Sequence, residues 1–127
     1  MCRADDANPA IILGSELYTA RKPHTCQECG RIIAIGETYL RERGLADGEP
    51  FTHKTCEHCQ VARDWLQREC GGFVYTEIEE ELREHWHEAP SYHTRELARL
   101  IYGMKHQWRT RKGGLMSRPA QTVSGDA

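Results

Sequence analysis

The sequence predicts a small α+β protein organised around a metal site. Two Cys-x-x-Cys pairs lie in the first half of the chain, and two short strand-like segments joined by Asp47-Gly48 lie between them. Residues 73–112 contain no cysteine and carry apolar residues at helical spacing. The length of 127 residues allows one domain, or a small module followed by a helical extension.

The composition excludes several classes of protein. No apolar run approaches the ~20 residues that span a bilayer, and residues 1–14 lack the basic and apolar regions of a secretory signal. We therefore expect a cytoplasmic protein with no membrane partner, in which cysteines bind metal more often than they form disulfides. The net charge of -2 excludes a uniformly basic nucleic-acid coat, although charge can still be segregated locally.

Four segments are expected along the chain. They are a flexible N-terminal segment over 1–17, a zinc module over 18–72, a helical extension over 73–112 and a disordered tail over 113–127. The first segment has no sustained periodicity, and the last is rich in Gly, Ser, Pro and Ala.

The module is expected to contain, in order, a knuckle over 26–30, a strand over 37–43, a return strand over 50–53 and a helix. Gly30 allows the backbone of the knuckle to turn so that its amides face the thiolates. Thr55 is the expected N-cap of the helix, and Gly71 is expected to end it.

Two further helices are expected after the module. The capping box Thr76-x-x-Glu79 opens the first of them, and Pro90 ends it. The second runs from about Thr94 to Lys112, and its apolar stripe ends at Trp108.

The spacing of four cysteines predicts one structural zinc ion. Cys26-x2-Cys29 is followed after 26 residues by Cys56-x2-Cys59. Four thiolates suit tetrahedral zinc, and each pair supplies two ligands from one tight turn. The second pair is expected in the first turn of a helix, where free N–H groups and the dipole stabilise negative sulfurs.

Two alternatives for the ligands remain open. His53 is separated from Cys56 by two residues, so that a site of three cysteines and one histidine could form without Cys59. A second zinc would draw on the remaining candidates Cys70, His85, His87 and His93. His85 and His87 project to nearly opposite sides of a helix, which favours a single ion.

The cysteine region resembles the treble-clef zinc fingers. The string Cys29-Gly30-Arg31-x-Ile33-x-x-Gly36-Glu37-x-Tyr39, with the distal Cys56-x-x-Cys59, looks like small uncharacterised zinc proteins of bacterial prophages and other mobile elements. The resemblance covers about residues 23–70 and implies the fold of that region. It does not imply a function, because treble clefs serve many purposes.

The sequence does not predict an enzyme. Nucleases of the HNH type on treble clefs use paired histidines and usually an asparagine, whereas the hairpin offers His53 alone and the sole asparagine is Asn8. No His-x-Glu precedes the cysteine pairs, as a zinc deaminase would require. A zinc ion held by four cysteines has no open position for water or for a small-molecule substrate.

Charge is segregated in the helical half. Residues 77–88 contain six glutamates and one arginine, whereas residues 95–118 contain seven Lys or Arg and one Glu. Each block can be a solvated helix face. The functional interpretation is that the last helix contacts phosphates or an acidic protein surface, and Arg41 and Arg43 are possible additions. The residues that we expect to bind this partner are Arg95, Arg99, Arg109 and Arg111.

Two functions follow from these observations. The first is a zinc-stabilised module that binds nucleic acid or a nucleoprotein complex through its basic last helix. The second is an interaction module that inhibits a host defence complex, of the anti-CRISPR or anti-restriction type. This second function is implied by the resemblance to mobile-element proteins.

Overall fold

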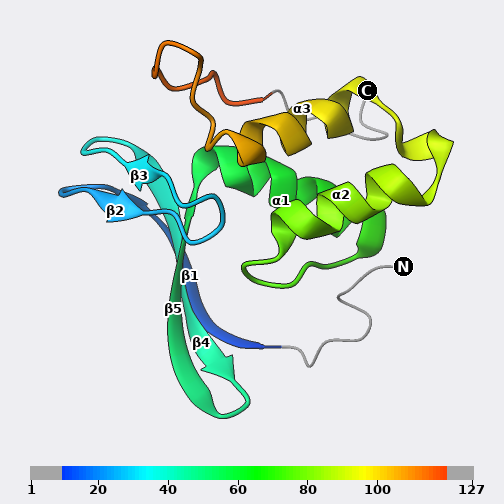
Figure 1. The fold of residues 1–127 in the computed structure, drawn as a ribbon. Coiled ribbons are helices and arrows are strands. Elements are labelled where there is room, and N and C mark those ends of the chain that lie inside the picture. Colours follow the sequence, from blue (N-terminus) through cyan, green and yellow to red (C-terminus); the bar gives the residue numbers. More distant parts are fainter. Residues whose placement is uncertain (1–9, 120–127) are drawn as a thin grey trace, which may run out of the picture.

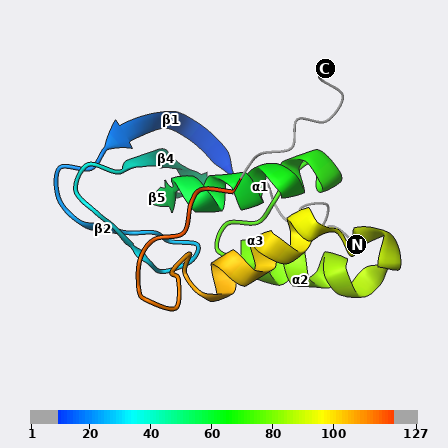
Figure 2. The same cartoon turned by 90° about the horizontal axis from the view of Figure 1, so that it is seen from above.

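The computed structural model describes residues 10–119. The helices lie together on one side of a three-stranded antiparallel sheet, whose long hairpin extends beyond them (Figure 1). Seen from above, α3 crosses the helical layer and the chain after it returns toward the start of α1 (Figure 2). Within the described range, no helix is long and apolar enough to cross a membrane.

The sheet consists of β1 (Ile11–Thr19), β4 (Thr38–Ala46) and β5 (Glu49–Cys56), in the order β1-β4-β5. The β4–β5 hairpin confirms the expected strand pair. Asp47 and Gly48 at its turn have φ of 52° and 81°, the left-handed conformation that suits a two-residue hairpin.

The strand β1 corrects the expected flexible segment over 1–17. Residues 11–17 pair with β4, whereas residues 1–9 lie outside the described range. The strand is exposed along almost its whole length and has a bulge between Ile12 and Gly14. Its sequence therefore lacks the alternation of apolar and polar residues by which half-buried strands are recognised.

Two short strands, β2 (His24–Thr25) and β3 (Ile32–Ile33), enclose the first cysteine pair. Helix α1 (Glu57–Cys70) follows β5 directly and ends at Gly71, whose φ of 74° is the expected left-handed stop. The N-cap is Cys56 rather than Thr55, because the Cys56 sulfur accepts the hydrogen bond from Cys59 N–H.

Helix α2 (Ile78–Glu88) begins without the expected capping box. Thr76 has a φ of 69° and lies outside the helix. The N-cap residue is Glu77, and its side chain makes no capping hydrogen bond. Instead, the buried carboxylate of Glu81 reaches back and accepts a hydrogen bond of 2.9 Å from Val74 N–H.

A short 3₁₀ helix η2 (Pro90–Tyr92) separates α2 from α3 (Arg95–Lys105). Thr94 caps α3 by accepting a hydrogen bond from Leu97 N–H. The helix is shorter than expected, because it ends at Lys105 and Trp108 follows in a left-handed conformation with a φ of 58°.

One apolar core joins the helices to the cysteine region. Its members from all parts of the chain include Ile33, Cys56, Leu66, Leu82, Leu100 and Trp108. Trp65 and Trp108 are buried, and the half-buried Trp86 packs against the same core.

The expected disordered tail over 113–127 is corrected in part. Met116 N–H donates a hydrogen bond of 2.6 Å to Trp108 C=O, so this part of the segment is ordered against the fold. Residues 120–127 lie outside the described range.

Candidate metal centre

The first cysteine pair lies in the knuckle between β2 and β3. Cys26 N–H donates to Arg31 C=O at 2.9 Å, and Gly30 N–H donates to Cys26 C=O at 2.9 Å, which closes the turn. Gly30 has a φ of 81°, as the knuckle requires of a residue without a side chain. The turn thereby holds Cys26 and Cys29 on one side of the hairpin.

The second pair lies at the junction of β5 and α1. Cys56 is the last residue of the strand and the N-cap of the helix, and Cys59 is in the first helical turn. The positive end of the helix dipole favours ionised sulfurs at this position.

The fold brings these four cysteines together as expected. Their sulfur atoms all lie within 4.8 Å of one another, and none of the four is in a disulfide. Cys26, Cys56 and Cys59 are buried, whereas Cys29 keeps partial exposure at the edge of this enclosed cluster. Four such sulfurs with no other ligand group among them suit a single structural metal ion in tetrahedral coordination.

Among residues 10–119, three N–H groups donate hydrogen bonds to the sulfurs. Cys56 N–H donates to Cys26 Sγ at 3.4 Å, and Cys59 N–H donates to Cys56 Sγ at 3.4 Å. The indole N–H of Trp108 donates to Cys59 Sγ at 3.3 Å. Hydrogen bonds of this kind offset the negative charge that four thiolates would concentrate around a divalent ion.

The thiols influence one another strongly. The hydrogen bond between Cys29 and Cys26 lowers the pKa of Cys26 and raises the pKa of Cys29. A metal ion bound here would displace the thiol protons, since the thiolate is the form that ligates.

A buried arginine lies beside the cluster. Arg31 makes a two-pronged pair with Glu37, with N···O distances of 2.8 and 3.1 Å. Burial acts to lower the pKa of Arg31, but Glu37 and the Cys56 sulfur raise it above its ordinary value, so the guanidinium stays charged. Its charge offsets part of the negative charge of the thiolates.

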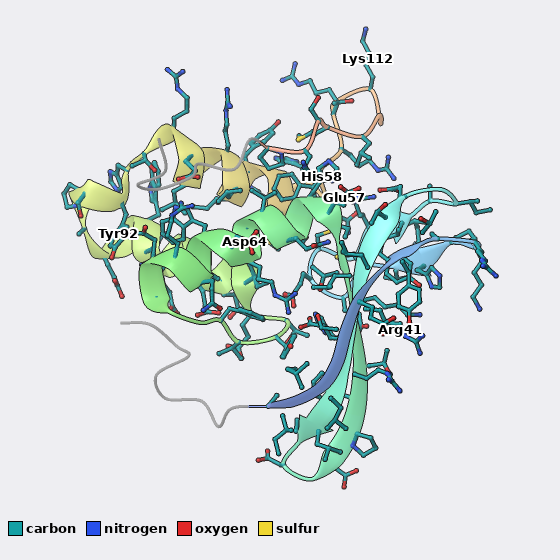
Figure 3. All side chains as sticks on the ribbon, turned by 180° about the vertical axis from the view of Figure 1, so that it is seen from behind. Arg41, Glu57, His58, Asp64, Tyr92 and Lys112 are labelled. Carbon is teal, nitrogen blue, oxygen red and sulfur yellow. The ribbon has the colours of Figure 1, made fainter. Side chains whose placement is uncertain are left out.

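His58 connects this arginine to the C-terminal segment. Burial lowers the pKa of His58, which favours the neutral ring. Arg31 then donates to Nδ1 at 3.3 Å, while Nε2–H donates to Met116 C=O at 2.6 Å. Glu57 and His58 mark this start of α1 in Figure 3.

His53 is not part of the cysteine cluster. Its Nε2 lies 2.8 Å from Glu28 Oε2, which also accepts a hydrogen bond of 2.8 Å from Thr76 N–H. The ring packs against Tyr75, with 4.6 Å between the centroids. The position of His53 therefore favours Cys59 as the fourth ligand.

No second cluster of three or more metal-ligating residues occurs within residues 10–119. Cys70 Sγ and His85 Nε2 lie 3.0 Å apart, which brings two of the suggested ligands together. Cys70 is disulfide-bonded, however, and so is not a thiolate ligand.

The four arginines expected on one helix are divided between two elements. Arg95 and Arg99 are exposed on α3, whereas Arg109 and Arg111 lie in the loop that follows it. Figure 3 shows Lys112 projecting from the tip of this loop. The division arises because α3 ends at Lys105.

The expected acidic face of α2 also needs correction. Glu81 is 2% exposed, so it belongs to the interior rather than to the solvated face. Glu80 and Glu88 are exposed as expected. The acidic surface of α2 is therefore smaller than the helical wheel indicates.

Comparisons of the chain with protein-family models, with curated proteins and with solved structures gave no match.

Proposed function

We propose that the protein is a non-catalytic, zinc-stabilised module that binds nucleic acid or a nucleoprotein complex through α3 and the loop after it. The observation that carries this proposal is the exposed pair Arg95 and Arg99 beside the half-exposed ring of Tyr102. Neither arginine forms an ion pair within residues 10–119. Unpaired guanidinium groups and an exposed aromatic ring are the groups that contact phosphates and bases.

The proposed metal is zinc, and the proposed fold of the cysteine region is a treble clef. The order of knuckle, hairpin and helix supports this fold, and the four enclosed sulfurs support the choice of zinc. Four protein ligands leave no coordination position for water, which is why we propose a structural and not a hydrolytic role for the ion.

Two grooves flank Tyr102 on the surface of α3. The first has a volume of about 570 Å³ and is lined by Arg95, Arg99 and the segment Met116–Pro119, among others. The second has a volume of about 530 Å³ and contains Trp86 and Lys105 in its wall. Both grooves combine apolar walls with cations, an arrangement that suits bases and the phosphates between them.

Salt-dependent binding tests this proposal. We expect zinc-loaded protein to bind a short labelled DNA duplex with an affinity that falls steeply with salt. Arg95→Gln/Arg99→Gln should flatten the log–log slope by about 0.9 for each lost phosphate contact. Zinc content and thermal stability should stay unchanged, because exposed charges contribute little to folding. The absence of measurable binding to duplex or single strands at near-physiological salt would contradict the proposal.

A protein partner is a second candidate, which the surface of β1 favours. This edge strand exposes large apolar side chains, with Ile11 60%, Leu13 65% and Leu17 64% exposed. An edge strand of this kind suits pairing with a strand of another protein. In a mobile-element setting that partner would be a host defence complex. Leu13→Lys/Leu17→Lys should then abolish capture of the complex and leave nucleic-acid binding unchanged.

A further inference from the structure

The sheet has a face that is turned away from the helices, and three cations lie on it. Arg41 and Arg43 are two residues apart on β4 and so share one face, and Lys54 of β5 lies directly opposite Arg41. Glu42, between the two arginines, points the other way and pairs with Arg63 of α1. Figure 3 shows Arg41 on the side of the sheet remote from α1. We call Arg41, Arg43 and Lys54 the outer cationic face.

The cations of this face have no acidic partner. Within the described part of the chain, none of the three forms an ion pair. Lys54 Nζ lies 3.1 Å from His24 Nδ1, and the Arg41 guanidinium lies over the ring of Tyr18, 5.7 Å from its centroid. Glu16 lies opposite Arg41 on β1, but its carboxylate accepts a hydrogen bond of 2.9 Å from Tyr18 O–H.

The fold does not explain this arrangement. Like charges directly opposite each other on neighbouring strands destabilise a sheet, and Arg41 and Lys54 form such a pair. The buried arginines of the same protein do have acidic partners, since Arg31 pairs with Glu37 and Arg63 pairs with Glu42. The outer cationic face therefore lacks the compensation that the fold supplies elsewhere.

A fourth cation, Lys22, lies near His24, which contacts Lys54. Lys22 precedes β2 and is exposed, so it extends the positive region beyond the three strand residues.

We infer that the outer cationic face is a second contact surface for single-stranded nucleic acid, on which Arg41, Arg43 and Lys54 contact phosphates and Tyr18 contacts a base. The cations of β4 repeat at about 6.6 Å along the strand, which suits a linear polyanion. Tyr18 is 38% exposed beside them, and an aromatic ring on an open sheet face is a stacking platform for a base. A base can stack on this ring while the neighbouring phosphates contact the cations, which favours a nucleic acid over an acidic protein. The inference rests on the proposed nucleic-acid function but on different residues.

The experiment uses full-length, zinc-loaded protein and a labelled dT strand of about 16 nucleotides. The sheet variant is Arg41→Gln/Arg43→Gln/Lys54→Gln, and the helix variant is Arg95→Gln/Arg99→Gln. A charge-preserving variant, Arg41→Lys/Arg43→Lys/Lys54→Arg, is the matched control. Zinc content and melting temperature establish that each variant is folded.

We expect the sheet variant to flatten the log–log salt slope by about 2, since each phosphate contact on a single strand contributes about 0.7. The charge-preserving variant should keep the slope of the wild type. Photocross-linking of a strand that carries 5-iododeoxyuridine should label Tyr18, and Tyr18→Leu should remove that label.

The other outcomes separate the two proposals. If the helix variant alone flattens the slope, the outer cationic face is not a contact surface, and the proposed function stands without it. If the sheet variant alone flattens the slope, this inference holds and α3 does not contact single strands. No binding of the strand by wild-type protein overturns this inference, whereas the duplex measurement decides the proposed function. Binding of polyglutamate in place of the strand would assign the face to an acidic protein.

Discussion

The indole N–H of Trp108 donates a hydrogen bond to the Cys59 sulfur at 3.3 Å, which ties the chain after α3 to the cysteine cluster. The neighbouring contact between His58 and Met116 C=O, at 2.6 Å, fastens the same segment to the start of α1. The C-terminal segment and the proposed metal ion therefore stabilise each other.

Trp108→Phe should weaken the metal site while leaving its four ligands in place. The phenyl ring keeps most of the apolar contact, but the Cys59 sulfur loses a donor. Hydrogen bonds to charged groups contribute about 1.5–3 kcal/mol, so we expect a loss of stability of that order. Zinc release to a colorimetric chelator should be faster than in wild type. Trp86→Phe is the control, because Trp86 is half-buried and lies in the groove beside α3 rather than at the sulfurs.

Gly103→Ala should destabilise the protein, although the same change usually stabilises a helix by about 0.5–1 kcal/mol. A Cβ atom at Gly103 would lie 2.0 Å from the ring of Trp108. The ring would have to move, and overpacking of this kind costs about 1–3 kcal/mol. Urea unfolding of the zinc-loaded protein measures whether the substitution lowers or raises the free energy of unfolding. An increase in stability would mean that Trp108 does not pack over this helix turn.

The sequence predicts the cysteine cluster and its supporting hairpin well, because their determinants are local. Cys-x-x-Cys spacing, Asp47-Gly48 and Gly71 each act within a few residues of their own position. Trp108 shows where such reasoning fails. Its spacing fits an apolar helical stripe, but its side chain makes a contact with Cys59, 49 positions earlier in the chain, and the helix ends before it.

Sequence spacing alone also indicates the wrong environment for Glu81 and for His53, for the same reason. Glu81 has the helical position of a solvated residue, yet it satisfies the backbone of a loop that the helical wheel does not contain. His53 has the sequence spacing of a metal ligand relative to Cys56, but its ring pairs with the carboxylate of Glu28, which the fold brings beside it. Tertiary contacts decide both cases, and periodicity along the chain carries no information about them.

Cys59→Ser and His53→Ala should differ in metal content. Cys59 belongs to the four-sulfur cluster, so its replacement should abolish stoichiometric zinc and unfold the cysteine region. His53→Ala should keep one zinc per chain and lose only stability, about 1–3 kcal/mol, because buried Glu28 loses a partner. Elemental analysis of both purified variants measures this difference. The opposite result, with zinc retained in Cys59→Ser and lost in His53→Ala, would make His53 the ligand.

Stability should fall in alkaline solution through Tyr75. Burial, together with the charge of Glu42, raises the pKa of Tyr75 to about 12, whereas an exposed tyrosine titrates near 10. The folded state therefore favours the neutral phenol. This contribution is fully present below about pH 10 and is lost as the pH rises toward 12. Urea midpoints measured across this range should decrease, and Tyr75→Phe should reduce the decrease. An identical decrease in both proteins would assign it to other groups.

Metal removal should weaken nucleic-acid binding at α3 even though the proposed ion contacts no nucleic acid. Trp108 and Met116 line the groove that contains Arg95 and Arg99, and the Cys59 sulfur holds Trp108 in that position. Without metal, the cluster loses the stabilisation that keeps its sulfurs in place, so the wall of the groove should separate from α3. The arginines would remain on the helix, but they would no longer be preorganised around one groove, and binding weakens when that ordering has to be supplied on association.

We therefore expect chelation to lower the affinity for the DNA duplex and added zinc to restore it, with metal content followed by elemental analysis. The Arg95→Gln/Arg99→Gln variant is the matched comparison, because it has already lost the contacts that the groove organises and should respond less to chelation than wild type. If metal-free protein bound the duplex with unchanged affinity and salt slope, the groove would not depend on the Trp108–Cys59 contact. The cysteine cluster and the basic surface would then be independent parts of the molecule.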